Sequence, residues 1–246
     1  MILFLSAPIS IFASNLEKEK RWAAQVVDSI IDGETVWLND GKSNFLGIYT
    51  DAEEDKNRAL IVMHGTGVHP NWQQVVQPLR VGLTEHNWNT LSIQMPVLSN
   101  DAKHEEYAPL YSEVIPRINA AVADLKSRGN KKIFLIGHSQ GATMSAYYLT
   151  TSKQDINGFV AIGMSSFGTD LRQSGVNSLK SISIPVLDLY ALEDLDTVLN
   201  TTEARAQAAR ESDNKNFTQK QITGNHFFDD ENETLIKTVA EWLEKQ

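Results

Sequence analysis

A serine stands between two glycines in the segment Gly137-His138-Ser139-Gln140-Gly141. The apolar run at residues 133–136 is typical of a buried strand, and residues 142–149 have the composition of a helix. A strand, a G-x-S-x-G turn and a helix together form a nucleophile elbow, in which the serine hydroxyl stands exposed above the edge of a sheet. The same pentapeptide also occurs as an ordinary glycine-rich turn, so the assignment of Ser139 as a nucleophile depends on residues later in the chain.

A serine hydroxyl is a poor nucleophile at neutral pH and needs a neighbouring base that an acid orients. His226 is the last histidine of the chain and lies between a predicted strand at 217–222 and a predicted helix at 231–244. Because the order serine, acid, histidine is the one found with nucleophile elbows, His226 is the predicted base. The preferred acid is Asp194, which follows a predicted strand at 184–190. The alternatives are Asp196, Glu193, Asp170 and Asp188.

Attack on a carbonyl also requires N–H donors for the oxyanion that forms. One donor is expected from the backbone of Gln140, which directly follows Ser139. The second is expected from the loop His64-Gly65-Thr66-Gly67, with Thr66 preferred and Gly67 as the alternative. This loop lacks the G-x-x-x-x-G-K-[ST] spacing of a phosphate-binding loop, so a nucleotide site is not indicated.

Composition excludes several other kinds of site. The chain has no cysteine, which excludes disulfides, thiolate metal sites and a cysteine nucleophile. Its histidines lack an H-E-x-x-H spacing, so no metal is predicted, and acyl transfer through serine needs no cofactor. Asp and Glu total 31 against 22 Lys and Arg, a net charge of −9 without a basic stripe. A nucleic acid is therefore not an expected partner, and a small-molecule acyl substrate is.

Strands and helices alternate along the chain. Strands are predicted at 35–38, 45–49, 59–63, 88–95, 133–136, 158–162, 184–190 and 217–222, and helices at 17–31, 72–85, 105–128, 142–149, 201–211 and 231–244. We expect Pro78 and Pro116 to bend or restart their helices. This alternation predicts an α/β fold with a mostly parallel central sheet and helices on both faces. The short interval between the strands at 158–162 and 184–190 leaves no room for a large cap domain.

Residues 1–14 are apolar and are followed by a highly charged segment at 15–21. The apolar length matches the hydrophobic region of a secretory signal and is too short to span a bilayer, although a positive region before it is missing. A segment that packs on the domain is the alternative. We expect a signal-like leader at 1–14, one domain at 15–246, no integral membrane span, and export to the periplasm or medium, with the cytoplasm as the alternative.

From residue 59 onwards the chain resembles the α/β-hydrolases, through His64-Gly65 and the segments 137–141, 185–194 and 224–227. More narrowly, it is similar to a bacterial domain family of unknown function within that clan, through the segments 64–72, 79–80, 87–92 and 185–190. The resemblance implies the α/β-hydrolase fold and a triad of Ser139, Asp194 and His226. Ala191 departs from the pattern, because these proteins usually have a glycine before the acid loop.

These features predict a serine hydrolase that cleaves a carboxylic ester or thioester of a small or medium acyl group through an acyl-enzyme. An acyltransferase would use the same intermediate. A non-catalytic, envelope-associated binding protein is the alternative from another class, because a fold does not prove activity. Substrate choice is expected to depend on the loops at 68–77, 96–107 and 165–181. The pattern sets neither the acyl chain length nor the oligomeric state.

Overall fold

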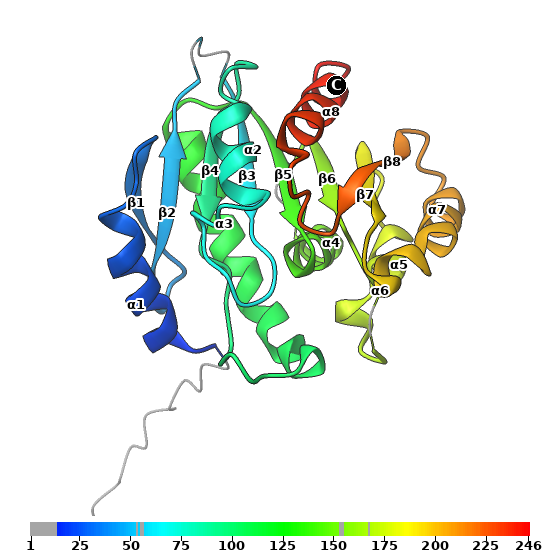
Figure 1. Cartoon of the computed structure of the whole chain (residues 1–246), viewed down its shortest axis with the longest axis horizontal. Coiled ribbons are helices and arrows are strands. Elements are labelled where there is room, and N and C mark those ends of the chain that lie inside the picture. The colour runs from blue at the N-terminus through cyan, green and yellow to red at the C-terminus, as the bar shows by residue number, and fades with distance from the viewer. Residues whose placement is uncertain (1–13, 53, 55–56, 153–154, 167) are drawn as a thin grey trace, which may run out of the picture.

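The computed structural model describes residues 14–52, 54, 57–152, 155–166 and 168–246. Apart from Ser14, the predicted leader lies outside the described residues. The strands are β1 (Glu34–Asn39), β2 (Asn44–Thr50), β3 (Arg58–Met63), β4 (Asn89–Ile93), β5 (Lys132–His138), β6 (Gly158–Ile162), β7 (Val186–Glu193) and β8 (Phe217–Asn225). They form one sheet in the order β1-β2-β4-β3-β5-β6-β7-β8 (Figure 1).

The sheet is mostly parallel, as predicted. Strand β2 pairs antiparallel with both β1 and β4, and all other neighbours pair in parallel. The central strands β4 and β6 are buried at every position. Such continuous buried runs are what a parallel sheet needs, because helices cover both of its faces. The carboxyl ends of the parallel strands meet at one edge, which is where this topology places a site.

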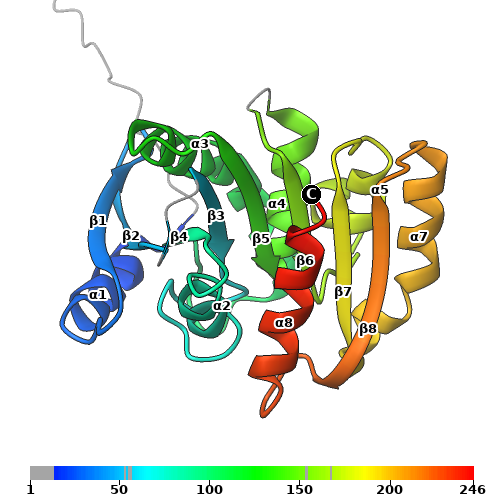
Figure 2. The same cartoon turned by 90° about the horizontal axis from the view of Figure 1, so that it is seen from above.

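Helices form a layer on each face of the sheet. The α-helices are α1 (Leu16–Val27), α2 (Val76–Gly82), α3 (Tyr111–Ser127), α4 (Gln140–Thr151), α5 (Gly175–Leu179), α6 (Asp196–Leu199), α7 (Thr202–Glu211) and α8 (Asn232–Leu243), and the 3-10 helices are η1 (His104–Leu110) and η2 (Leu171–Gln173). Helices α1, α2 and α8 lie on one face, and α3, α4, α5 and α7 on the other (Figure 2). This arrangement confirms the predicted α/β-hydrolase architecture without a large cap.

The predicted helix at 72–85 is wrong in its first part. Helix α2 begins only at Val76, and residues 72–75 belong to the preceding loop. Val75 has φ 62° and ψ −55°, and the N–H of Val76 donates to the carbonyl of Gln74 at 2.6 Å, which is a γ-turn with positive φ. Pro78 therefore lies in the first turn of the helix, where its missing N–H is not needed, and has no preceding helix to bend.

Other element bounds also differ from the prediction. The helix expected at 105–128 is divided into η1 and α3, with the junction at Leu110 and Tyr111, so Pro116 lies inside α3. Helix α5 lies in a segment that the sequence predicts as a loop, and α1 ends at Val27 rather than at residue 31. Strands β7 and β8 run to Glu193 and Asn225, beyond their predicted ends. Each of these two strands therefore ends directly before a predicted triad residue.

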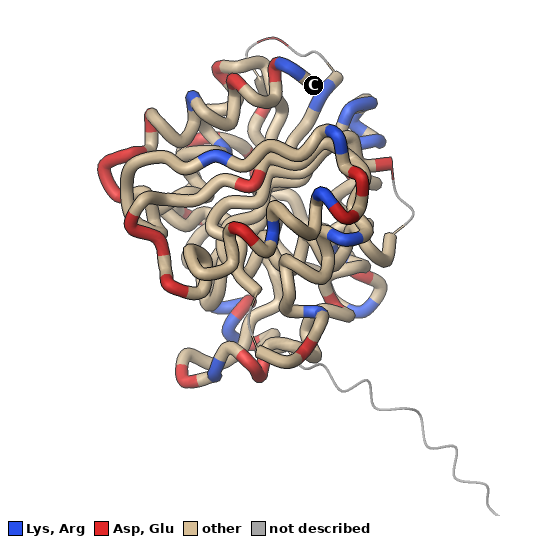
Figure 3. The backbone as a smooth tube through the Cα atoms, turned by 90° about the vertical axis from the view of Figure 1, so that its right-hand side faces the viewer, with Lys and Arg blue, Asp and Glu red and all other residues tan. Residues whose placement is uncertain are grey.

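Charges of both signs are interspersed along the backbone on the side of the molecule that carries α7 and β8 (Figure 3). No helix in the described residues has the length and apolarity needed to cross a bilayer. Within the same residues, no three His, Asp or Glu side chains come together as a metal site.

Candidate active site

The backbone around Ser139 forms a tight elbow between β5 and α4. Ser139 has φ 54° and ψ −120°, a conformation that is strained for a residue with a side chain. A Cβ atom on Gly137 would lie 2.5 Å from the carbonyl oxygen of Gly141, and one on Gly141 would lie 2.5 Å from that of His64. Both glycines are therefore required for the close approach of strand and helix, which is what the G-x-S-x-G pattern predicts.

Asp194 and His226 are joined by a hydrogen bond between Oδ1 and Nδ1 of 2.5 Å. The same carboxylate accepts the N–H of Ala191 at 3.0 Å and that of Leu195 at 2.8 Å. Burial acts to raise the pKa of Asp194, but the hydrogen bonds from His226, Ala191 and Leu195 outweigh it and the pKa is lowered. An ionised Asp194 keeps the proton of the neutral imidazole on Nδ1, which leaves Nε2 as the atom that accepts a proton.

The other candidate acids are placed elsewhere. Asp170 caps η2 and pairs with Arg172 at 2.6 Å, and Asp188 pairs with Arg205 at 2.8 Å in the interior. Asp196 and Glu193 have exposed side chains on either side of Asp194. Of the acids that the sequence leaves open, Asp194 is the one that the structure hydrogen-bonds to His226. Ala191 contributes its N–H to that carboxylate, a contact that needs no glycine.

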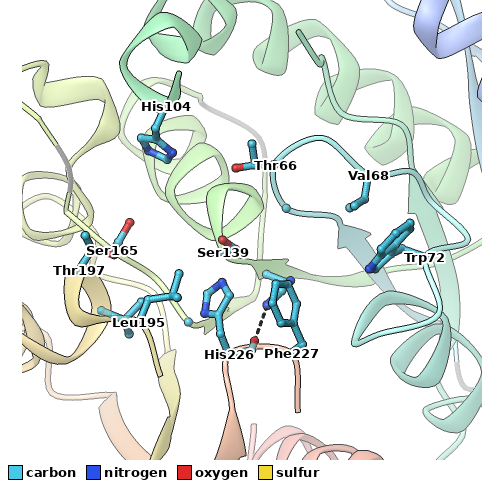
Figure 4. A pocket seen from close by; sticks show the side chains of 14 residues that line it. Thr66, Val68, Trp72, His104, Ser139, Ser165, Leu195, Thr197, His226 and Phe227 are labelled. Carbon is cyan, nitrogen blue, oxygen red and sulfur yellow. Dashed lines mark hydrogen bonds between the residues drawn. The ribbon is translucent and has the colours of Figure 1, made fainter. Parts of the chain in front are cut away.

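Ser139 and His226 line the same pocket, which has a volume of about 330 Å³. Figure 4 shows the imidazole of His226 directed toward Ser139. Among the described residues, no hydrogen bond joins these two side chains. Nucleophile and base are often this loosely placed without substrate, and their hydrogen bond tightens when substrate binds.

The pocket walls come from five segments around the elbow, one of which is His226 with Phe227. Val68, Trp72, His104 and Ser165 belong to the three loops that the sequence predicts as walls. The fourth segment, which follows Asp194 and includes Leu195, Thr197 and Val198, is not predicted from the sequence. The sequence does contain a signal for this segment, because residues that directly follow a triad member at the end of a strand must border the pocket.

The predicted oxyanion loop lies against the elbow. A Cβ atom on Gly65 would be 3.1 Å from the Cβ of Ser139, and the Thr66 hydroxyl donates to Oε1 of Gln140 at 3.1 Å. Gln140 begins α4, so its N–H has no acceptor within the helix and points out of the helix end. The structure thus brings Thr66 and Gln140 together beside Ser139.

Two buried histidines support the oxyanion loop and the loop that carries His226. His64 donates from Nδ1 to the carbonyl of Gly65 at 2.8 Å and accepts the N–H of Met95 at 2.9 Å on Nε2. His138 donates from Nε2 to the carbonyl of His226 at 2.9 Å. Burial lowers the pKa of His64 to about 3, and burial together with the neighbouring His226 lowers the pKa of His138 to about 4. Both rings are therefore neutral at pH 7 and act as hydrogen-bonding supports.

The family described as "Protein of unknown function (DUF3530)" matches residues 7–113 and 99–245. The chain belongs to this family. The match confirms the narrower resemblance seen in the sequence. No curated protein matches the DUF3530 chain by sequence similarity.

Solved structures share the fold of this DUF3530 protein at low sequence identity. Est1E from Butyrivibrio proteoclasticus is 15% identical, with a TM-score of 0.67 over 87% of this chain and 98% of its own. An α/β serine hydrolase homologue from Coxiella burnetii is 16% identical, with a TM-score of 0.68 over 86% and 98%. A putative dienelactone hydrolase from Klebsiella pneumoniae is 12% identical, with a TM-score of 0.71 over 87% and 98%. The chain therefore has the α/β-hydrolase fold over most of its length.

Proposed function

We propose that the protein is a serine hydrolase that cleaves a carboxylic ester or thioester through an acyl-enzyme on Ser139. The observation that carries this proposal is the 2.5 Å hydrogen bond between Asp194 and His226, in a pocket that His226 shares with the strained elbow serine. A buried acid, a histidine and a serine in this order supply an orienting group, a base and a nucleophile.

In the first half of the reaction, the Ser139 hydroxyl oxygen attacks the carbonyl carbon of the ester while His226 Nε2 takes its proton. Asp194 stabilises the imidazolium that forms, and the N–H groups of Thr66 and Gln140 donate to the oxyanion. Collapse of the tetrahedral intermediate breaks the bond to the alcohol or thiol, which leaves with the proton from His226. In the second half, His226 deprotonates a water molecule, whose oxygen attacks the carbonyl carbon of the acyl-enzyme. The bond from that carbon to Ser139 Oγ then breaks, His226 returns the proton to Oγ, and the carboxylic acid leaves.

The similar structures support an ester as the substrate class. They include an esterase from Pyrococcus furiosus and Est1E with ferulic acid bound. Because these chains share the fold at low identity, their substrates do not transfer to this protein directly. They support the inference that this fold serves ester chemistry here as well.

A fluorophosphonate probe tests the proposal, because it reacts with an activated serine and with no resting hydroxyl. We expect stoichiometric labelling of the wild type, loss of labelling in Ser139→Ala, and full labelling in Ser165→Ala, which removes another hydroxyl from the same pocket. Folded wild-type protein that never labels would overturn the proposal in favour of a non-catalytic binding protein.

A further inference from the structure

A second hollow, of about 500 Å³, lies beside the catalytic pocket, and Trp72 lines both. One wall is α1 with the residues after it, and the other is the loop that leads from β3 into α2, which lies with α1 on the same face of the sheet (Figure 2). We call this hollow the amide pocket. Its polar lining consists of His69 and the uncharged side chains of Gln25, Ser29, Asn71, Gln73, Gln74 and Gln77.

No described residue that lines the amide pocket carries a formal charge, in a protein with a net charge of −9. Burial lowers the pKa of His69, the titratable group in this lining, so its imidazole is neutral at pH 7. Val26, Ile31 and Trp72 add apolar surface. A charged ligand would lose hydration on entering this pocket, and no opposite charge in the walls would compensate for that loss.

Most of these amides have hydrogen-bonding capacity to spare. Within the described residues, the side-chain amides of Gln25, Gln73 and Gln77 have no hydrogen-bond partner. Arg80 is buried and donates from Nη2 to Oδ1 of Asn71 at 2.9 Å. Because a guanidinium can only donate, this contact fixes the orientation of the Asn71 amide and leaves its N–H₂ group for another acceptor. The pocket thus presents both donors and acceptors.

The aromatic wall between the two pockets is held in place by a chain of hydrogen bonds. Trp72 Nε1 donates to Gln74 Oε1 at 3.2 Å, and Gln74 Nε2 donates to Asp229 at 2.6 Å. Asp229 also accepts from the side chain of Asn225 at 3.0 Å. Asn225 directly precedes His226, so the indole and the proposed catalytic base are positioned from the same loop.

The walls themselves are rigidly attached to the domain. Helix α1 is anchored by a buried ion pair of 2.9 Å between Glu19 and Arg117, and the N–H of Val97 donates to Glu19 as well. On the other side, the fully buried Val75 holds the loop in its γ-turn. The backbone of both walls is therefore in place before a ligand enters, and the ordering that binding requires is confined to side chains such as those of Gln25, Gln73 and Gln77.

We propose that the amide pocket binds an uncharged, hydroxyl-rich group, such as a sugar ring, that is linked through an ester to the acyl group held at Ser139. Sugar hydroxyls both donate and accept, as side-chain amides do, and the C–H faces of a sugar ring pack on indole and aliphatic surfaces. A purely apolar group would instead bury the amides without partners. The inference rests on the proposed hydrolase function and narrows its substrate class to acylated saccharides.

The test compares two esters with the same acyl group, the butanoyl ester of methyl glucoside and ethyl butanoate. We expect the wild type to favour the sugar ester by about tenfold or more in kcat/KM, the effect of one or two net hydrogen bonds. Gln77→Ala should lower this preference several-fold, mainly through a higher KM for the sugar ester. Gln221→Ala, an exposed glutamine on β8 that lines neither pocket, should leave it unchanged.

A binding measurement separates this inference from the proposed function. Titration calorimetry of the Ser139→Ala protein with the butanoyl glucoside should detect binding that Gln77→Ala weakens several-fold and Gln221→Ala does not. Hydrolysis of ethyl butanoate with no preference for the sugar ester, and no such binding, would overturn the amide-pocket inference alone. Binding that depends on Gln77 without hydrolysis or probe labelling would leave the pocket standing and overturn the hydrolase.

Discussion

The catalytic pocket and the amide pocket lie on either side of Trp72 and are built differently. At the catalytic pocket the groups that position the histidine are already engaged, because Asp194 accepts three hydrogen bonds and His138 donates one to the carbonyl of His226. In the amide pocket the walls are fixed, but the amides of residues such as Gln77 have no partner among the described residues. The catalytic pocket therefore positions the reacting groups, whereas the amide pocket recognises the substrate. Substitutions in the catalytic pocket should change the rate of hydrolysis, and those in the amide pocket should change the preference for the sugar ester.

The largest effect is expected from Asp194→Asn. Loss of the carboxylate allows the wrong tautomer of His226, and we expect kcat to fall about 10⁴-fold with little change in KM. Steady-state hydrolysis of 4-nitrophenyl acetate measures this. Asp196→Asn and Asp170→Asn are matched controls that should retain activity, because neither carboxylate contacts the histidine. Loss of activity in Asp170→Asn but not in Asp194→Asn would assign the role of the orienting acid to Asp170, in the segment after β6.

The packing of the catalytic histidine can be tested with two glycines of similar backbone conformation. Gly163 has φ 58° and Gly168 has φ 64°, so alanine at either position carries a comparable strain of about 1–2 kcal/mol. A Cβ on Gly163 would lie 2.9 Å from Cε1 of His226, whereas one on Gly168 has its nearest neighbour at 4.0 Å. We expect Gly163→Ala to lower kcat/KM about 10- to 100-fold beyond any effect of Gly168→Ala. Equal activities would contradict the tight placement of His226.

The neutral state of His138 predicts a pH dependence of stability. Its pKa is lowered to about 4 in the folded protein and is near 6.5 in an unfolded chain, so the unfolded state binds an additional proton between these values. The contribution of His138 to the free energy of unfolding should therefore fall as the pH decreases from about 6.5 to about 4, and level off below. Denaturant titrations at several pH values measure the slope.

His138→Gln supplies the comparison. The amide retains a donor for the carbonyl of His226 but does not titrate, so the slope of stability against pH should decrease by up to one proton, about 1.4 kcal/mol per pH unit. His138→Leu also removes the proton uptake, but loses the hydrogen bond and should lower kcat as well. If the slope is unchanged in both variants, His138 is not a neutral buried group in the wild type.

The smallest effect is expected from Asp229→Ala, which breaks the hydrogen-bond chain from Asn225 to Trp72 at an exposed position. With Trp72 less firmly held, the preference for the butanoyl ester of methyl glucoside over ethyl butanoate should fall a few-fold. Glu233→Ala, at another exposed acidic residue near the start of α8, is the control. A preference that survives Asp229→Ala in full would mean that Trp72 is fixed by packing alone.

The sequence predicts the alternation of strands and helices and the elbow because those signals are local. Buried runs such as residues 133–136, and glycines on either side of Ser139, indicate their structure within a few residues. Asp194 could be preferred because it follows a strand, although the strand itself ends later than expected. Its selection over Asp170 depends on the hydrogen bond to His226, which is far away in the chain, and only the folded structure shows that bond.

The remaining features depend on contacts that no local pattern encodes. The loop at 72–75 has helical composition, and it departs from a helix because burial of Val75 holds a γ-turn. The amide pocket joins Gln25 of α1 to Gln77 of α2, and glutamine in either helix is unremarkable alone. The bond from His138 to the carbonyl of His226 likewise joins two strand ends that only the sheet brings together.

The most direct test of the central claim is to trap the acyl group on its serine. After rapid mixing with 4-nitrophenyl butanoate and acid quenching, mass spectrometry of the protein and its peptides should show one butanoyl group on Ser139 in the wild type. Ser139→Ala should carry none. A burst of 4-nitrophenol equal to the enzyme concentration should accompany the modification. Hydrolysis without a burst and without a modified Ser139, or a butanoyl group on another residue, would contradict the account.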